Sequence, residues 1–282
     1  MQIWRSPWGD GNPGWHIECT AMSTKYLGKQ FDIHGGGMDL KFPHHEDEIA
    51  QSCGAHGANP ANYWMHANML NVNGQKMSKS FGNYFLPKEI IEGTTELFDK
   101  PYSANVLRFF MMQAHYRSIL DFSNDGILAA EKGFTRLMDG LELIKDLKPN
   151  AVSSIDIATW KQNCYEAMND DFNTPILIAN LFEGIKYVNL VNDGKETLTA
   201  ADITVLGETL KSFTFDVLGI KDEKAVSNQT DKLEGVVELL INMRLEARAN
   251  KDFALSDQIR DQLLALGIQL KDGKEGTTFS IQ

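Results

Sequence analysis

The sequence has few cysteines, no long apolar run and no excess of positive charge. Its three cysteines, Cys19, Cys53 and Cys164, form an odd, sparse set in 282 residues, which argues against a disulfide framework. No uninterrupted apolar run approaches the ~18 residues that a membrane span requires. The first eight residues lack the basic-then-apolar pattern of a signal peptide. We therefore expect a cytoplasmic protein with no membrane partner.

The charge balance excludes a general nucleic-acid binder. The formal net charge is −11, whereas neutralising phosphates requires clustered lysine and arginine. An enzyme that acts on RNA is still allowed, because a local basic patch can bind RNA on an acidic protein. The length suits two or three domains, and 43% hydrophobic residues are ordinary for a globular protein with a real core.

Residues 76–80, Lys-Met-Ser-Lys-Ser, offer two ammonium groups and two hydroxyls to one polyanion. A nucleoside triphosphate is the candidate ligand, because such donors stabilise phosphoryl oxygens. The alternative for an arbitrary pair of lysines is a solvated surface loop. The whole pentapeptide, however, resembles the KMSKS signature of class I aminoacyl-tRNA synthetases. We expect catalysis by Lys76 and Lys79, and ATP binding by Lys79, Ser78 and Ser80.

Residues 43–48, Pro-His-His-Glu-Asp-Glu, concentrate metal-ligand chemistry. His44 and Glu48 are four residues apart and share one face of a helix, and Cys19 lies upstream. Cysteine, histidine and glutamate all bind zinc, which usually takes four ligands. The alternative is an acid-rich helix start near the positive end of the helix dipole. That alternative explains the acidic residues but not the two adjacent histidines.

The pattern changes along the chain from an α/β region to helices. Short apolar runs at 31–33 and 68–72 predict strands, and 46–53 can be helical. Apolar residues recur at helical spacing in 127–147, and Thr174 followed by Pro175 predicts a capped helix start. A further helix is predicted at 104–114. The predicted helices that form a bundle, spanning about 125–220, are 127–147, 160–168, 175–192 and 200–218.

The C-terminal part predicts a separate small unit. Residues 221–231 are polar and lack periodicity, so we interpret them as a linker. A helical hairpin at 233–250 and 253–266 precedes a β-hairpin that ends the chain. The helical hairpin carries four candidate tRNA contacts, for which a solvated charged face is the alternative: Arg244, Arg248, Lys251 and Arg260.

Taken together, these motifs closely resemble bacterial-type cysteinyl-tRNA synthetase. The resemblance covers essentially the whole chain, including residues 170–175 and 273–278. It implies the remnant of a Rossmann-like α/β class I catalytic domain, then an α-helical tRNA-binding bundle and a small α+β domain. The segments that carry it are 15–19, 31–37, 42–52, 63–66 and 76–80. The expected boundaries are 1–85 for the catalytic part, 86–124 for a stem-contact region, 125–222 for the bundle and 232–282 for the C-terminal domain.

The resemblance also implies roles for particular residues. Cys19, His44 and Glu48 match three of the family's four zinc ligands, and the zinc contacts the thiolate of substrate cysteine. Trp15 and His34 match the amino-acid pocket. The implied reaction activates L-cysteine with ATP, with Mg²⁺, and transfers it to tRNA(Cys); we expect a monomer.

Two other functions remain open at this stage. A related ligase joins cysteine to an amino sugar in mycothiol synthesis and shares the zinc and KMSKS regions, but the C-terminal tail fits tRNA recognition better. The second alternative is not an enzyme: residues 85–282 could form a non-catalytic tRNA-binding module.

The sequence departs from the family at its start. No cysteine precedes Cys19 and no histidine opens an H-x-G-H motif. From the resemblance we therefore expect a chain that starts within the catalytic domain and lacks one zinc ligand. We expect weak or absent zinc and an inactive chain. The purified chain should show no cysteine-dependent ATP–pyrophosphate exchange, and measurable exchange would contradict this expectation.

Overall fold

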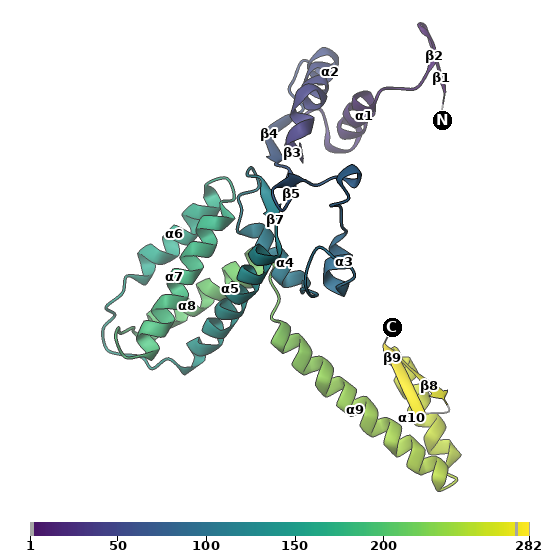
Figure 1. Ribbon diagram of the computed structural model, residues 1–282, viewed down its shortest axis with the longest axis vertical. Coiled ribbons are helices and arrows are strands. Elements are labelled where there is room, and N and C mark those ends of the chain that lie inside the picture. Colours follow the sequence, from purple (N-terminus) through teal and green to yellow (C-terminus); the bar gives the residue numbers. More distant parts are fainter. Residues whose placement is uncertain (1–2, 274–275, 282) are drawn as a thin grey trace. The chain divides into compact units, whose positions relative to one another are not determined.

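The computed structural model describes residues 3–273 and 276–281, which form two compact units divided after Ile220 (Figure 1). The first unit joins an α/β part to a helical bundle. The second contains a helical hairpin and a β-hairpin. No described helix is both long enough and apolar enough to cross a membrane.

The α/β part is built around one parallel strand pair. Strands β3 (Phe31–Gly37) and β4 (Ala61–Ala67) run parallel, with Gly36 opposite His66, and helix α2 (Glu46–His56) lies in the connection between them. The strand expected at 31–33 and the helix expected at 46–53 are confirmed. The elements that precede this pair are β1 (Trp4–Ser6), β2 (Gly9–Gly11) and α1 (Trp15–Leu27).

A three-stranded sheet connects the α/β part to the bundle. Its central strand β5 (Leu70–Val72) pairs antiparallel with β6 (Gln75–Lys76) and parallel with β7 (Leu120–Phe122). The strand expected at 68–72 therefore begins at Leu70. Val72 and Phe122 are buried in the main apolar core. Helices α3 (Pro87–Glu92) and α4 (Ala104–Met112) lie in the long connection from β6 to β7.

Four helices pack side by side in the bundle (Figure 1). The apolar face predicted in α5 is confirmed, since Ile127, Phe134 and Leu137 are all buried. Side-chain caps start the helices, as Asp156 does by accepting a hydrogen bond of 3.0 Å from the Thr159 N–H. The bounds are α5 (Asn124–Leu143), α6 (Ile157–Asn169), α7 (Thr174–Asn192) and α8 (Ala200–Lys211).

Two details of the bundle differ from the sequence-based expectation. The cap of α7 is Asn173, whose side chain accepts from the Ile176 N–H, and not Thr174. Asp171 and Phe172 adopt positive φ angles of 53° and 55°, and this turn places Asn173 directly before the helix. The helix expected at 200–218 ends as α8 at Lys211 and continues as a wider helical turn, η5 (Ser212–Val217).

The second unit has its own small core. Helices α9 (Glu223–Ala249) and α10 (Phe253–Ala265) and the hairpin β8 (Ile268–Gly273) and β9 (Gly276–Ile281) form it. The linker expected at 221–231 is wrong, because α9 begins at Glu223. That segment is polar but contains no proline or glycine, so helix propensity prevails over missing periodicity. The buried core residues are Val237, Ile241, Ile259, Leu263 and Ile268. Lys274 and Glu275 of the predicted terminal motif lie outside the described residues.

A close helix contact in the bundle gives a stability prediction. A Cβ atom at Gly184 of α7 would lie 2.5 Å from Cζ2 of Trp160, whose Nε1 donates to the Asn180 carbonyl at 2.8 Å. Alanine gains up to ~1 kcal/mol of helix propensity, but overpacking costs ~1–3 kcal/mol. We expect Gly184→Ala to lower the free energy of unfolding by about 1 kcal/mol in urea titrations. Gly133→Ala is the matched control, because its Cβ would meet Phe109 at an ordinary 3.4 Å. Equal stability of the two variants would contradict the packing argument.

Candidate functional site

The α/β part is organised around polar side chains. Among residues 3–60 the buried residues are His45, Glu48, Ser52 and Pro60, and α1 buries none of its side chains. Large apolar side chains here are exposed instead, including Trp15 at 58% and Ile33 at 54%. The centre of this region is therefore a cluster of titratable groups.

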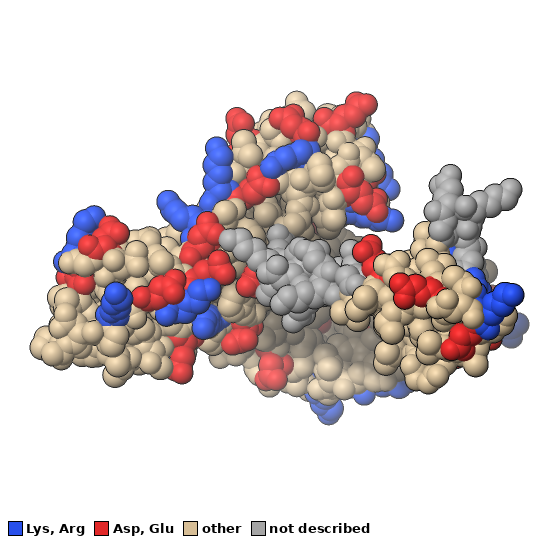
Figure 2. Space-filling model, turned by 90° about the horizontal axis from the view of Figure 1, so that it is seen from below, with Lys and Arg blue, Asp and Glu red and all other residues tan. Residues whose placement is uncertain are grey.

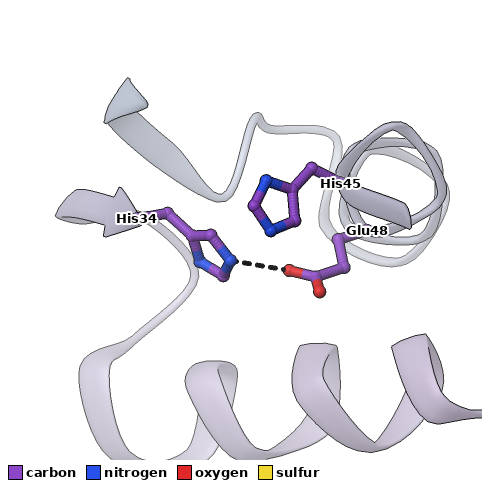
Figure 3. A group of neighbouring side chains, drawn as sticks. All are labelled: His34, His45 and Glu48. Carbon is purple, nitrogen blue, oxygen red and sulfur yellow. Dashed lines mark ion pairs between the residues drawn. The ribbon is translucent and has the colours of Figure 1, made fainter. Parts of the chain in front are cut away.

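Glu48 of α2 is the contact point of this cluster. Its Oε2 lies 3.2 Å from Nε2 of His34 on β3, the pair marked in Figure 3. Its Oε1 lies 3.7 Å from Nδ1 of His16 on α1. Cys19, one turn further along α1, hydrogen-bonds with the same carboxylate. Residues from α1, β3 and α2 therefore converge on one buried carboxylate.

His45 lies beside this pair and is held by its own contacts (Figure 3). Its Nδ1 is 2.9 Å from Nε2 of His66 on β4. Gly36 leaves room for the ring, because a Cβ there would come within 2.7 Å of His45 Cε1. Burial, together with neighbouring His34, lowers the pKa of His45 to about 4. At neutral pH its imidazole is uncharged and can offer a lone pair to a metal.

The side chains gathered around Glu48 are of the types that bind zinc, but they are not the same residues that sequence spacing predicted. Ligand atoms of His34, His45 and Glu48 lie within 4.8 Å of one another. Cys19 adds a thiol, whose pKa is raised by burial and then by Glu48, so it is protonated without a metal. Thiol, imidazole and carboxylate are the ligand types that zinc takes in proteins.

His44 is not in that group, because its Nδ1 faces Nε2 of His16 at 2.8 Å. His16 in turn has a buried Nδ1 with no hydrogen-bond partner, on the side of Glu48. Sequence spacing alone did not single out His16, His45 and His66 as members of this cluster. The i, i+4 spacing to Glu48 favoured His44. Two features of the sequence could have identified the other histidines: His45 is adjacent to His44, and His16 precedes Cys19 by three residues, which places both on one face of a helix.

The two residues expected in the amino-acid pocket border the same cluster. The Trp15 ring stacks on His16 with centroids 5.2 Å apart and lies 5.0 Å from His44. His34 packs against Trp64 with centroids 4.7 Å apart. Trp15 and His34 therefore lie at the cluster, but their binding of an amino acid stays a prediction.

The KMSKS loop is a compact turn that displays its polar groups. Strand β6 ends at Lys76, and a short 3₁₀ turn, η3 (Lys79–Phe81), follows. The Ser78 hydroxyl caps this turn by accepting from the Phe81 N–H at 3.3 Å, and it lies 3.1 Å from the Ser80 hydroxyl. Lys76, Lys79 and Ser80 are exposed, and the Lys79 ammonium lies 5.3 Å from the Tyr84 ring centre.

Polar contacts join the connecting region to the bundle. Asp171 accepts hydrogen bonds from the Tyr116 hydroxyl and the Arg117 guanidinium, which lowers the pKa of its carboxyl group. Asn68, between β4 and β5, donates to the Arg117 carbonyl at 2.8 Å. These contacts fix the α6–α7 turn against the strands that lead to the KMSKS loop.

The four candidate tRNA contacts differ in accessibility. Arg244 is only 2% exposed within the second unit, so its guanidinium is not on the surface, which corrects the expectation for this residue. Arg260 pairs with Asp257 and Asp261 at 3.0 and 2.9 Å. Arg248 and Lys251 are exposed. On the face drawn in Figure 2, basic and acidic side chains are interspersed over the described residues.

Comparison with known families assigns the class. Residues 2–132 match tRNA synthetases class I (C) catalytic domain, and residues 163–221 match the DALR domain. A LeuRS–tRNA–LeuAMS ternary complex from Agrobacterium radiobacter K84 shares the fold, with a TM-score of 0.52 and 14% identity over 75% of this chain and 32% of that one. The α/β part and the bundle therefore have the fold of a class I tRNA synthetase.

Curated relatives show a closer similarity than the shared fold does. The chain is 51% identical over 279 residues to a cysteine--tRNA ligase of Bacteroides fragilis, and 48% and 44% identical to those of Porphyromonas gingivalis and Cytophaga hutchinsonii. Each match covers 99% of this chain and 57% of the relative. The chain is therefore similar to cysteine--tRNA ligases over almost its whole length, and it spans a little over half the length of these relatives.

Proposed function

We propose that the chain is the part of a cysteine--tRNA ligase that holds the substrate thiol, the ATP phosphates and the tRNA. The observation that carries the proposal is the convergence of Cys19, His16 and His34 on Glu48 in a chain similar to cysteine--tRNA ligases. A thiol, a carboxylate and imidazole rings at one point are suited to a metal that binds sulfur.

The chemistry assigned to the KMSKS loop is electrostatic. The carboxylate of L-cysteine attacks the α-phosphate of ATP, and pyrophosphate leaves. Lys76 and Lys79 stabilise the negative charge on the phosphates, and Ser78 and Ser80 add hydroxyl donors. Mg²⁺ accompanies ATP in this proposal. The terminal ribose hydroxyl of tRNA(Cys) then accepts the cysteinyl group.

Cys19, His44 and Glu48 are the residues that would hold zinc, with Trp15 and His34 around the bound amino acid. Zinc supplies, when bound, a thiophilic Lewis acid that distinguishes a thiol from the hydroxyl of serine. The His44 ring has to leave His16 to join this set, whereas His34 and His45 already lie beside Glu48. The ligand set is thus open to a direct test.

The tRNA is assigned to the bundle and the second unit. The DALR match lies in the bundle, and the expected domain ranges of 125–222 and 232–282 are kept as proposals. Arg248 and Lys251 are the exposed candidates for phosphate contacts, with Arg260 available if its aspartate pairs open. We further propose a monomer that acts in the cytoplasm.

Transfer of labelled cysteine tests the function. The protein purified from its native cells, given ATP and ³⁵S-cysteine, should place the label on tRNA(Cys). Lys79→Ala should lower the rate about 10²–10³-fold, the usual cost of one charge-stabilising group. Lys88→Ala, an exposed lysine of α3 outside the loop, should leave it unchanged.

Label on an amino sugar instead would replace the proposal with the mycothiol-type ligase. Binding of tRNA without any transfer of label would replace it with the non-catalytic module.

Zinc analysis tests the ligand set. The protein purified from its native cells should contain one zinc, in contrast to the weak binding expected of the 282-residue chain alone. Cys19→Ser or Glu48→Gln should weaken zinc binding at least about tenfold. Cys53→Ser is the control, because that thiol lies on the same helix as Glu48 but is exposed and outside the group of clustered ligand atoms. Loss of zinc in His45→Gln but not in His44→Gln would assign the site to His34, His45 and Glu48.

A further inference from the structure

One buried polar side chain next to the KMSKS loop has no role in the function proposed above. Asn83 is 9% exposed and lies just after the loop. Its Nδ2 donates to the Lys76 carbonyl at 3.1 Å, and its Oδ1 accepts from the Ser78 N–H at 2.8 Å. Both hydrogen-bonding ends of one amide are therefore used on the main chain of the loop, on either side of Met77.

Met77 is held from the opposite side. Its N–H donates to the Leu70 carbonyl of β5 at 3.0 Å, and its side chain packs against the main core. The main chain of residues 76–78 is thus fixed by one strand and one amide. The lysine side chains remain exposed while the backbone that carries them is held.

Local backbone geometry directs Asn83 to this position. Gly82 has φ +69°, the left-handed conformation that glycine adopts without strain, and a Cβ there would meet nothing within 4 Å. Gly82 ends the 3₁₀ turn η3, and the next residue faces back to Lys76. An amide is required there, because the site needs one donor and one acceptor in the same plane.

We infer that Asn83 is a positioning residue for the KMSKS loop, which sets the backbone of Lys76 and Ser78 so that the loop's cations meet the phosphates of a nucleoside triphosphate. The inference rests on the proposed function for its ligand, but the backbone clamp itself is independent of it. Preorganised cations need no reorganisation during reaction, so loss of the clamp reduces their effect on the rate.

Limited trypsin digestion of the chain tests the clamp without any activity. Lys76 and Lys79 are both trypsin sites, and we expect Asn83→Ala to speed cleavage after them about tenfold or more. Asn83→Asp keeps the acceptor for Ser78 but places an oxygen against the Lys76 carbonyl, and it should also speed cleavage. Asn163→Ala, an exposed asparagine of α6, should leave it unchanged. Unchanged cleavage in Asn83→Ala, or an equal increase after Lys161 in the bundle, overturns the inference.

A double-mutant cycle tests the link to the phosphates. In the native protein, Asn83→Ala should lower kcat/KM for ATP about 10–100-fold in cysteine-dependent exchange. In a Lys76→Ala/Lys79→Ala background the same substitution should cost less than about threefold, because it acts through those lysines. Equal losses in both backgrounds overturn the positioning role. A native protein with no exchange overturns the proposed function instead, and the trypsin result then decides the clamp alone.

Discussion

The three-residue strand β5 is the element on which the first unit depends. On one side it pairs with β6 and so fixes Lys76, and on the other it pairs with β7, which leads into the bundle. Val72 extends from it into the main core, and the Leu70 carbonyl accepts from Met77. A loop that meets a polyanion is thus attached directly to the best-packed part of the molecule. Few residues are needed because both edges of the strand are paired.

The two ends of the first unit are stabilised by different kinds of interaction. The bundle buries contiguous apolar side chains, which favours one arrangement through packing. The region around Glu48 instead buries histidines and a carboxylate that depend on one another for hydrogen bonds. Buried polar groups are stable only when they are satisfied, and the orphaned Nδ1 of His16 shows that this cluster is not. A ligand that bonds to this nitrogen would complete it.

Much of the bundle was predictable because helical periodicity is local. Ile127, Phe134 and Leu137 are buried as the spacing required. Helix ends were less predictable: Asn173 caps α7 because two residues of positive φ precede it, and a sequence pattern does not report φ. The start of α9 was missed because helix formers without an apolar stripe resemble a linker. Arg244 was predicted as a tRNA contact because it is basic, and the sequence does not show that its side chain is buried.

The sequence by itself determined the resemblance to cysteine--tRNA ligases, the KMSKS loop and the residue types that suit zinc. Each depends on short motifs whose chemistry lies in neighbouring residues. Only the tertiary structure decided which groups meet: His34 reaches Glu48 because β3 and α2 are adjacent in space, and His44 turns to His16 because α1 lies beside α2. The role of Asn83 was also decided only by the tertiary structure, because it depends on where the side-chain amide points. Contacts between side chains follow from strand pairing and helix packing, and these are set by the whole chain.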